Sequence, residues 1–403
     1  MTQSPRELRA VFRGRPFLSF GVAALFVLAT SCRVGWAGSV VPVLDDANLA
    51  LLDCPSGRRL AEVRLDRSVR ALASVVPSGN GPASVAVLGV DGVVSLHELP
   101  TLRERARRDG MPADGALVTT QGAGAGDRPG QVFVAIGGRR TTTSAPLRLL
   151  DAATLSDLHA YRLDPSVEVA ALAAVPGRQS LLVGLSRPVS PAEVWEIALS
   201  PDAPPVLKGL VHDYRMGEAV ALPGQYTPRP APVGSATAGF APGPVPYEWL
   251  RVAADGRVTV LHLEVRREIA RLPDAPGGWL LAPWTAEVPG AGRGWVVGEA
   301  GGSTLRRFDS VSWQLSEPVA LPGALLALTD GLEPGTVVAV IEQAGADLKS
   351  MIGEVDAVSL GFRARVEVAG QVQPGVRLLR AIDRRCLALV NPGGRWLGAL
   401  SGS

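Results

Sequence analysis

Short apolar strands separated by polar turns recur along most of the chain. Each copy has an apolar run that ends near an Asp or Glu, then a polar turn, then a second strand. The copies span residues 49–65, 93–107, 147–163, 194–210, 258–272, 305–321 and 352–368, and a further strand of this kind spans 396–400. Four of the turns begin with an Asp whose carboxylate can accept hydrogen bonds from the next backbone N–H groups. They are Asp53, Asp151, Asp309 and Asp356. The pattern predicts β-hairpins, and helical periodicity is scarce.

The spacing of the hairpins indicates how they assemble. They start about 45–65 residues apart, and two more apolar runs lie between successive hairpins. Residues 167–175 and 180–185 form one such pair, and 325–329 and 336–341 form another. A period of about 40–50 residues with four short strands per unit is typical of β-propeller blades. We therefore predict an all-β fold, a single β-propeller over residues 38–403. Eight hairpin strands favour eight blades, with seven as the alternative, and the first and last units each lack one strand.

One interval between hairpins is longer than the others, because an insertion follows the hairpin that ends at residue 210. We expect a long loop over residues 211–247. Its first part, 211–218, is dense in polar groups, whereas 234–246 is a run of Gly, Ala and Pro that we interpret as a passive spacer. Long loops in repeat proteins are usually functional or disordered, so we expect the first part to carry function.

The first 37 residues predict an export signal. Four arginines precede an apolar run, residues 17–30, that is shorter than the roughly 20 residues of a membrane span. The segment that ends at Cys32 resembles a lipobox, which makes Cys32 the expected lipidation site. Cleavage after Ala37 and an uncleaved anchor are the alternatives. All three place the body outside the cytoplasm, and we favour a periplasmic protein held by a lipid anchor.

Composition excludes some classes of function. The chain has 403 residues, 47% of them apolar, and its arginines are scattered rather than clustered, so no nucleic-acid footprint is visible. No zinc spacing, phosphate-binding loop, dinucleotide fingerprint or covalent c-type haem motif is present in a fitting context. Beyond the signal only Cys54 and Cys386 remain. They can pair in an oxidising compartment, where closing a propeller brings them together, or they can be two buried thiols.

The densest polar cluster lies in the insertion, at residues 211–218. Its chemical groups come from His212, Asp213, Tyr214, Arg215 and Glu218. A histidine can ligate iron or move a proton near neutral pH, and a neighbouring carboxylate can orient its ring. A guanidinium can hold a ligand carboxylate with two hydrogen bonds. The alternative is a polar strand edge that pairs internally. Asp213 and Glu218 are also the one acid pair that a propeller hydrolase could use.

Other polar or aromatic residues have plainer interpretations beside functional ones. Arg139 and Arg140 lie on a loop that either faces the same funnel as His212 or is simply solvated. We expect His262 to be a satisfied core histidine, and His97 and His159 to be solvated beside hairpin turns. Three tryptophans close together in sequence are expected to pack between blades. They are Trp279, Trp284 and Trp295.

Residues 212–218, with 223–225 and 227–229 downstream, resemble the cytochrome d1-type β-propeller family, and within it the periplasmic haem d1 biosynthesis proteins of the Nir F type. The resemblance covers roughly residues 145–275. It implies an eight-bladed propeller that binds haem d1 or its dihydro precursor in an axial funnel. The implied activity, of the dihydro-haem d1 dehydrogenase type, converts a propionate side chain to an acrylate and needs an electron acceptor. Nitrite-reductase assembly proteins are further implied partners, in a denitrification setting.

The resemblance also implies roles for the cluster. His212 would be the metal ligand and, with Glu218, the catalytic group. The macrocycle's carboxylates would be bound by Tyr214, Arg215, Arg139 and Arg140. Relatives carry histidines just after the hairpin at 258–272, whereas residues 273–289 contain none here. This departure motivates the alternative function, a divergent cofactor-free periplasmic propeller that acts as an interaction or assembly module.

Overall fold

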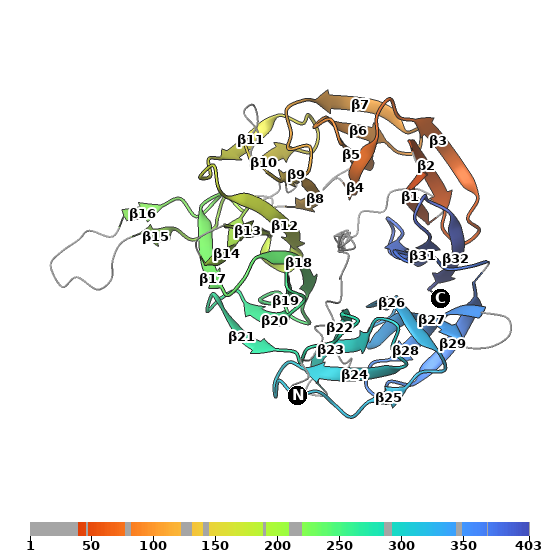
Figure 1. The fold of residues 1–403 in the computed structure, drawn as a ribbon. Coiled ribbons are helices and arrows are strands. Elements are labelled where there is room, and N and C mark those ends of the chain that lie inside the picture. The colour runs from red at the N-terminus through yellow and green to blue at the C-terminus, as the bar shows by residue number, and fades with distance from the viewer. Residues whose placement is uncertain are drawn as a thin grey trace, which may run out of the picture.

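The structure is a computed structural model. It describes residues 39–45, 47–76, 82–121, 131–139, 145–187, 191–208, 220–285, 292–343, 349–368 and 370–402. The described residues form eight sheets of three or four antiparallel strands, arranged around one axis (Figure 1). We call these sheets blades 1 to 8 in chain order. The expected all-β fold with eight blades is confirmed.

Six blades have four strands, and the first and last have three. Blade 1 is β1 (Val40–Asp45), β2 (Asn48–Asp53) and β3 (Arg59–Arg64); blade 2 is β4 (Val69–Val75), β5 (Ser84–Gly89), β6 (Val94–Glu98) and β7 (Arg103–Arg108); blade 3 is β8 (Ala116–Gln121), β9 (Val132–Gly137), β10 (Leu147–Asp151) and β11 (Asp157–Tyr161); blade 4 is β12 (Glu168–Val175), β13 (Ser180–Ser186), β14 (Ala192–Ala198) and β17 (Pro228–Val233). Blade 5 is β18 (Thr237–Pro242), β19 (Glu248–Ala253), β20 (Val258–His262) and β21 (Arg267–Arg271); blade 6 is β22 (Trp279–Thr285), β23 (Arg293–Glu299), β24 (Thr304–Asp309) and β25 (Val319–Ala320); blade 7 is β26 (Ala324–Asp330), β27 (Thr336–Gln343), β28 (Lys349–Asp356) and β29 (Phe362–Glu367); blade 8 is β30 (Arg377–Arg380), β31 (Cys386–Val390) and β32 (Trp396–Ser401). A 3₁₀ turn, η1 (Pro176–Arg178), joins β12 to β13, and a separate pair, β15 (Val206–Lys208) and β16 (Val220–Leu222), lies outside the blades.

Within a blade the chain runs from the axis outward, and the second strand is the most buried one. The second strand is covered by the neighbouring blades on both faces, as in β5, where every residue is buried. The outermost strand faces solvent along its edge, and β7 is correspondingly exposed or half-buried throughout. Apolar clusters therefore lie between adjacent blades, which explains why the middle strands have apolar residues at consecutive positions. Trp284 and Trp295 are buried in two such clusters and Trp279 packs against one, which confirms their expected packing role.

The acidic residues at the hairpin turns work as the sequence predicts. Asp151 accepts hydrogen bonds from the backbone N–H groups of Ala153 and Thr154, at 2.9 and 3.0 Å. Matching bonds reach Asp53 from Ser56 (3.2 Å), Asp309 from Ser312 (2.6 Å) and Asp356 from Ser359 (2.6 Å). Each carboxylate satisfies turn donors that no strand partner can reach, which stabilises the outer hairpin of its blade.

Blade 4 differs from the sequence-based expectation. The hairpin expected at 194–210 does not form, because β14 pairs with β17 and places Val194 opposite Ala231. The insertion therefore lies inside this hairpin rather than after it. The long loop expected over 211–247 is also wrong, since β16, β17 and β18 lie within that range. The presumed spacer contains β18, the innermost strand of blade 5, whose Phe240 is buried against Trp249 and its neighbours.

Three alternate prolines explain why β17 was hard to recognise. Pro228, Pro230 and Pro232 share one edge of the strand because backbone direction alternates from residue to residue. The backbone groups of Arg229 and Ala231, which alternate with the prolines, point toward β14. Proline has no N–H to donate, so it is tolerated on the outer edge of a sheet, and there it also hinders pairing with another chain.

The ring closes where blade 1 meets blade 8, at the red and blue ends of Figure 1. Cys54, just after β2, and Cys386, at the start of β31, form a disulfide with their Cα atoms 6.2 Å apart. This result decides between the two interpretations of these cysteines in favour of pairing. Ile382 also donates its N–H to Val40 O at 3.1 Å, and the Trp396 indole donates to Cys54 O at 3.2 Å.

The first and last blades each lack a strand, as expected. In blade 1, β1 is mostly buried like the second strand of a complete blade, and β3 is mostly exposed like an outermost strand. Blade 1 therefore lacks the innermost strand, whereas blade 8 lacks the outermost one. Within the described ranges no helix is long and apolar enough to cross a membrane. The export signal predicted over 1–37, including Cys32, lies outside those ranges.

Candidate functional sites

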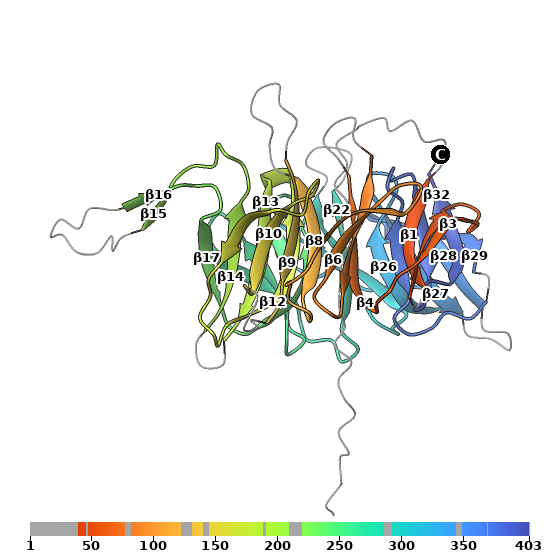
Figure 2. The same ribbon diagram turned by 90° about the horizontal axis from the view of Figure 1, so that it is seen from above.

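The polar cluster of the insertion lies between two strands that leave the ring. Residues 209–219 are outside the described residues, and with them His212, Tyr214, Arg215 and Glu218. The flanking strands β15 and β16 pair with each other, with Leu207 opposite Ala221. Figures 1 and 2 show this pair beyond the outer rim of blade 4, on the side away from the axis. The funnel position expected for His212 and its neighbours therefore stays a prediction.

The described part of the insertion is itself unusual. We call residues 206–208 and 220–222 the arm. The exposed fraction is 71% for Leu207 and 59% for Val220, which makes them two of the most exposed large apolar residues described. Two paired strands alone bury too little surface to be more than marginally stable in water. The arm is thus an apolar projection without a core of its own.

Arg139 lies between blades 3 and 4. Its guanidinium forms ion pairs with Glu168, at the start of β12, at 2.8 Å and with Asp114 at 3.5 Å. Asp114 also accepts a hydrogen bond from the Arg139 backbone N–H at 3.0 Å. The side chain remains 73% exposed, so these pairs contribute little to stability and leave the guanidinium accessible. Arg140, its expected companion, lies outside the described residues.

The three described histidines lie on outer strands, and the burial of each differs from expectation. His97, on β6, is buried rather than solvated, and its ring bonds the Ser95 hydroxyl at 3.0 Å and Leu102 O at 3.1 Å. His159, on β11, is half-buried beside the Tyr161 ring, and burial lowers the pKa of its imidazole. His262 ends β20 half-buried rather than in the core, with its ring centroid 5.0 Å from that of Tyr247.

The strands nearest the axis offer little polar chemistry. Five charged residues occur on the seven described inner strands: Arg70, Glu168, Asp330, Arg377 and Arg380. Arg380 pairs with Asp330 of the neighbouring blade at 2.8 Å, and Glu168 pairs with Arg139. None of these seven strands contains a histidine. These seven strands therefore contribute no histidine that could serve as an axial iron ligand.

A polar pocket of about 350 Å³ opens beside blade 5. Its buried centre is Arg251, whose side chain is 2% exposed and forms an ion pair with Glu268 at 2.7 Å. Arg251 also donates to Ser235 O at 2.9 Å, and Thr259 donates to Glu268 at 2.5 Å. Burial alone would raise the pKa of Glu268, but the hydrogen bonds from Thr259 and Arg251 lower it below its ordinary value. The pair joins the loop before β18 to the outer strands. Sequence reasoning missed it, although an arginine inside the apolar strand β19 was a signal.

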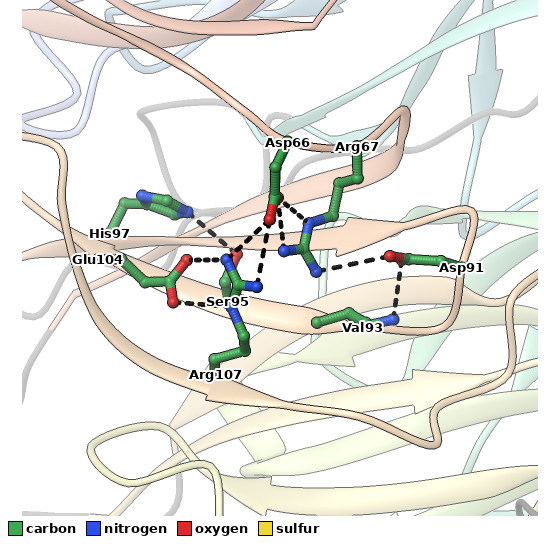
Figure 3. A network of polar contacts seen from close by, with 8 residues as sticks. All are labelled: Asp66, Arg67, Asp91, Val93, Ser95, His97, Glu104 and Arg107. Atoms are coloured by element: carbon green, nitrogen blue, oxygen red, sulfur yellow. Dashed lines mark hydrogen bonds and ion pairs between the residues drawn. The ribbon is translucent and has the colours of Figure 1, made fainter.

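A second ion-pair network fastens the connection between β3 and β4 to blade 2 (Figure 3). Asp66 accepts hydrogen bonds from Arg67, at 2.7 Å, and from Arg107, at 3.3 Å. Arg107 also pairs with Glu104 at 2.8 Å, and Arg67 lies 3.6 Å from Asp91. Each charged group has an opposite charge within the network. The arrangement holds residues 66 and 67 against the outer part of blade 2.

The fold is similar to that of other propellers of known structure. A dihydro-haem d1 dehydrogenase, NirN in complex with DHE, matches with a TM-score of 0.57 and 16% identity, over 91% of this chain and 73% of that one. BamB from Moraxella catarrhalis matches with a TM-score of 0.46 and 15% identity, over 75% and 78% of the two chains. BBS1N in complex with ARL6DN matches at 0.49 and 11%, over 82% and 90%. The first match supports the β-propeller fold.

No protein-family model and no curated protein matches the sequence.

Proposed function

We propose that this chain is an interaction or assembly scaffold that holds a partner protein through the arm of blade 4. The observation that carries the proposal is the exposure of Leu207 and Val220, at 71% and 59%, on paired strands outside the ring. A partner that removes these apolar side chains from water stabilises the complex by about 25 cal/mol per Å² of apolar surface buried. Binding would also order strands that are marginal alone.

The proposed setting is the periplasm, with the chain held to the membrane by a lipid on Cys32. The Cys54–Cys386 disulfide supports an oxidising compartment, because such bonds are rare in the cytosol. A lipid anchor would leave the ring free to present its arm to proteins near the membrane surface. Mass spectrometry of the protein purified from membranes tests this point, because a diacylated Cys32 must form the N-terminus.

A photo-crosslinking residue placed at position 207 tests the partner. We expect one discrete cross-linked product of fixed mass in cells that express the full chain. Val311 provides a matched control, because it is also 71% exposed but belongs to the ring. Equal products from positions 207 and 311, or none from 207, would contradict the proposal.

Tetrapyrrole binding is the second candidate, favoured by the similarity to a dihydro-haem d1 dehydrogenase in complex with DHE and by the motif at 212–218. When bound, haem d1 or its dihydro form would supply the iron and the redox-active macrocycle. His212 would ligate the metal, and Glu218 would orient His212. Tyr214, Arg215, Arg139 and Arg140 would hold the carboxylates. Since the seven described inner strands contribute no histidine, this candidate depends on His212.

Mixing the purified protein with haem d1 and recording the Soret region tests this candidate. Binding predicts a shifted Soret band that is lost in His212→Ala. His262→Ala is the control, since His262 packs against Tyr247 on an outer strand and should leave the spectrum unchanged. If the band does not move in the wild type, the tetrapyrrole candidate fails and the scaffold proposal is unaffected. A dehydrogenase activity would additionally require reduction of an added electron acceptor.

A further inference from the structure

Blade 8 has an open outer edge. Blades 2 to 7 each have a strand beyond the third, whereas the part of the chain that the structure describes places none beside β32. Gly402 donates its N–H to Arg385 O at 2.9 Å, which sets the alternation of hydrogen bonds along the pair β31–β32. Leu400 then bonds β31, and Ala399 and Ser401 direct their N–H and C=O groups outward.

The composition of β32 does not protect this edge. Its sequence, Trp-Leu-Gly-Ala-Leu-Ser, contains no charge and no proline. By contrast, β17 carries three prolines and β7 four arginines, and both kinds of residue discourage pairing with another chain. An uncharged edge with free donors and acceptors is a template for an added strand.

The strands on either side of this edge form two walls. On β29, Val366 lies opposite Ile352 of β28, and Arg363 lies opposite Glu354. Ile352 and Glu354 are two residues apart and so share one face of the sheet. Arg363 therefore lies on the same face as Val366, which packs against blade 8. On β3 of blade 1, Arg64 lies on the face shared with blade 8. Its partner on β2 is Asn48, two residues from Ala50, which belongs to the cluster between blades 1 and 8.

The charge on these walls is unbalanced. Arg64 and Arg363 are exposed, and neither forms an ion pair with any described residue. Their neighbours are paired already, since Arg59 contacts Glu62 at 2.8 Å and Arg365 contacts Glu354. Each wall therefore keeps one unpaired guanidinium beside the open edge. A strand placed there would meet positive charge on both sides.

We propose that the outer edge of β32 binds an extended, acidic segment of a partner protein, which adds as the fourth strand of blade 8 between β29 and β3. Main-chain hydrogen bonds to Ala399 and Ser401 would hold the segment, and acidic side chains would pair with Arg64 and Arg363. This inference rests on the proposed scaffold function but uses a surface separate from the arm.

The probe is a fluorescein-labelled synthetic peptide of alternating Glu and Val, about eight residues long, near the upper end of typical strand lengths. Its anisotropy is followed as the disulfide-bonded full chain is added. We expect saturable binding that weakens with salt, and no binding of a Lys/Val peptide of the same length. The double change Arg64→Glu with Arg363→Glu should weaken binding about tenfold or more. Arg162→Glu, at another exposed arginine, is the matched control and should leave binding unchanged.

A backbone variant tests strand addition directly. Ala399→Pro removes an N–H that faces outward and leaves the bonds of Leu400 to β31 intact, so the fold should persist and peptide binding should be lost. In the wild type, bound peptide should slow hydrogen exchange at Ala399 and Ser401, a readout independent of any variant.

Three outcomes would overturn the proposal. One is no binding of the acidic peptide, and another is equal binding of both peptides without protection of Ala399. The third is a dimer of the free chain, seen by sedimentation, that Ala399→Pro dissolves, because a second copy would then occupy the edge. Leu207→Asp should not affect the peptide, so failure at β32 is distinguishable from failure at the arm.

Discussion

The disulfide between Cys54 and Cys386 joins the first blade to the last across 332 residues of sequence. It lies at the one junction where the described chain lacks an inner strand on one side and an outer strand on the other. Both cysteines are fully buried within the cluster between these blades. A covalent bond thus holds the junction at which strand pairing contributes least.

Replacing both cysteines by serine should destabilise the ring. A cross-link that closes so long a loop restricts the unfolded chain, and its loss typically costs about 2–5 kcal/mol. Denaturant unfolding of Cys54→Ser with Cys386→Ser should show a lower midpoint than the oxidised wild type. Because the sulfurs are buried, reductant alone should leave the native wild type oxidised until it unfolds. Identical midpoints for variant and wild type would contradict the inferred role.

Gly57 and Trp396 predict a coupled effect at the same junction. Gly57 has φ +68°, and a Cβ there would lie 2.4 Å from the Trp396 ring. Gly57→Ala should therefore cost more than the roughly 1 kcal/mol typical of a positive φ alone. In a Trp396→Ala background the clash is absent, so the same change should cost less. A double-mutant cycle by thermal unfolding measures the difference, and strict additivity would show that the ring is not the obstacle.

Arg251 and Glu268 should behave as a buried pair. Glu268→Gln leaves the guanidinium of Arg251, 2% exposed, without its countercharge, and Arg251→Met removes the other partner. Breaking a fully buried pair from one side typically costs about 3–5 kcal/mol, and we expect a smaller loss here because the Glu268 side chain is 25% exposed. The double variant should cost less than the two single losses added together. Unfolding free energies from urea titration check this, and a double variant equal to the sum would indicate independent side chains.

The same pair predicts a pH dependence. The pKa of Glu268 is lowered in the folded protein, so its contribution is fully present above the ordinary carboxyl pKa. It is lost as pH falls through the lower folded value. Stability of the wild type should decline in acid more steeply than that of Glu268→Gln, in which this group no longer titrates. Parallel pH profiles would exclude the contribution of Glu268.

Glu248 predicts the opposite sign. Its side chain is 4% exposed, Oε2 has no hydrogen-bond partner among the described residues, and Arg293 lies 3.6 Å away. Burial raises the pKa of this carboxyl, so the folded state favours the protonated form. The resulting stability is present below the ordinary carboxyl pKa and is lost as pH rises through the folded value. Glu248→Gln should therefore raise the melting temperature at pH 7 relative to wild type and change it little at pH 4.

The two histidines on β6 and β11 show why sequence reasoning misplaced some side chains. His97 and His159 stand near polar turns, which usually indicates solvent. His97 is instead bonded to Leu102 O in the next turn. His159 lies beside the rings of Tyr161 and Tyr226, and Tyr226 follows the insertion of blade 4. Contacts of that kind depend on how distant segments meet, and a local pattern does not report them.

The strand pattern along the chain was enough to determine the all-β class, most of the repeating hairpins and the Asp-ended turns, and it favoured eight blades over seven, because each depends on local backbone preference and apolar spacing. Only the tertiary structure decided the partner of β14, the pairing of Cys54 with Cys386, the burial of Arg251 beside Glu268 and the open edge of β32. The disulfide and the open edge of β32 depend on ring closure, which brings residues 54 and 386 together. The partner of β14 and the Arg251–Glu268 pair instead depend on which strands meet within a single blade.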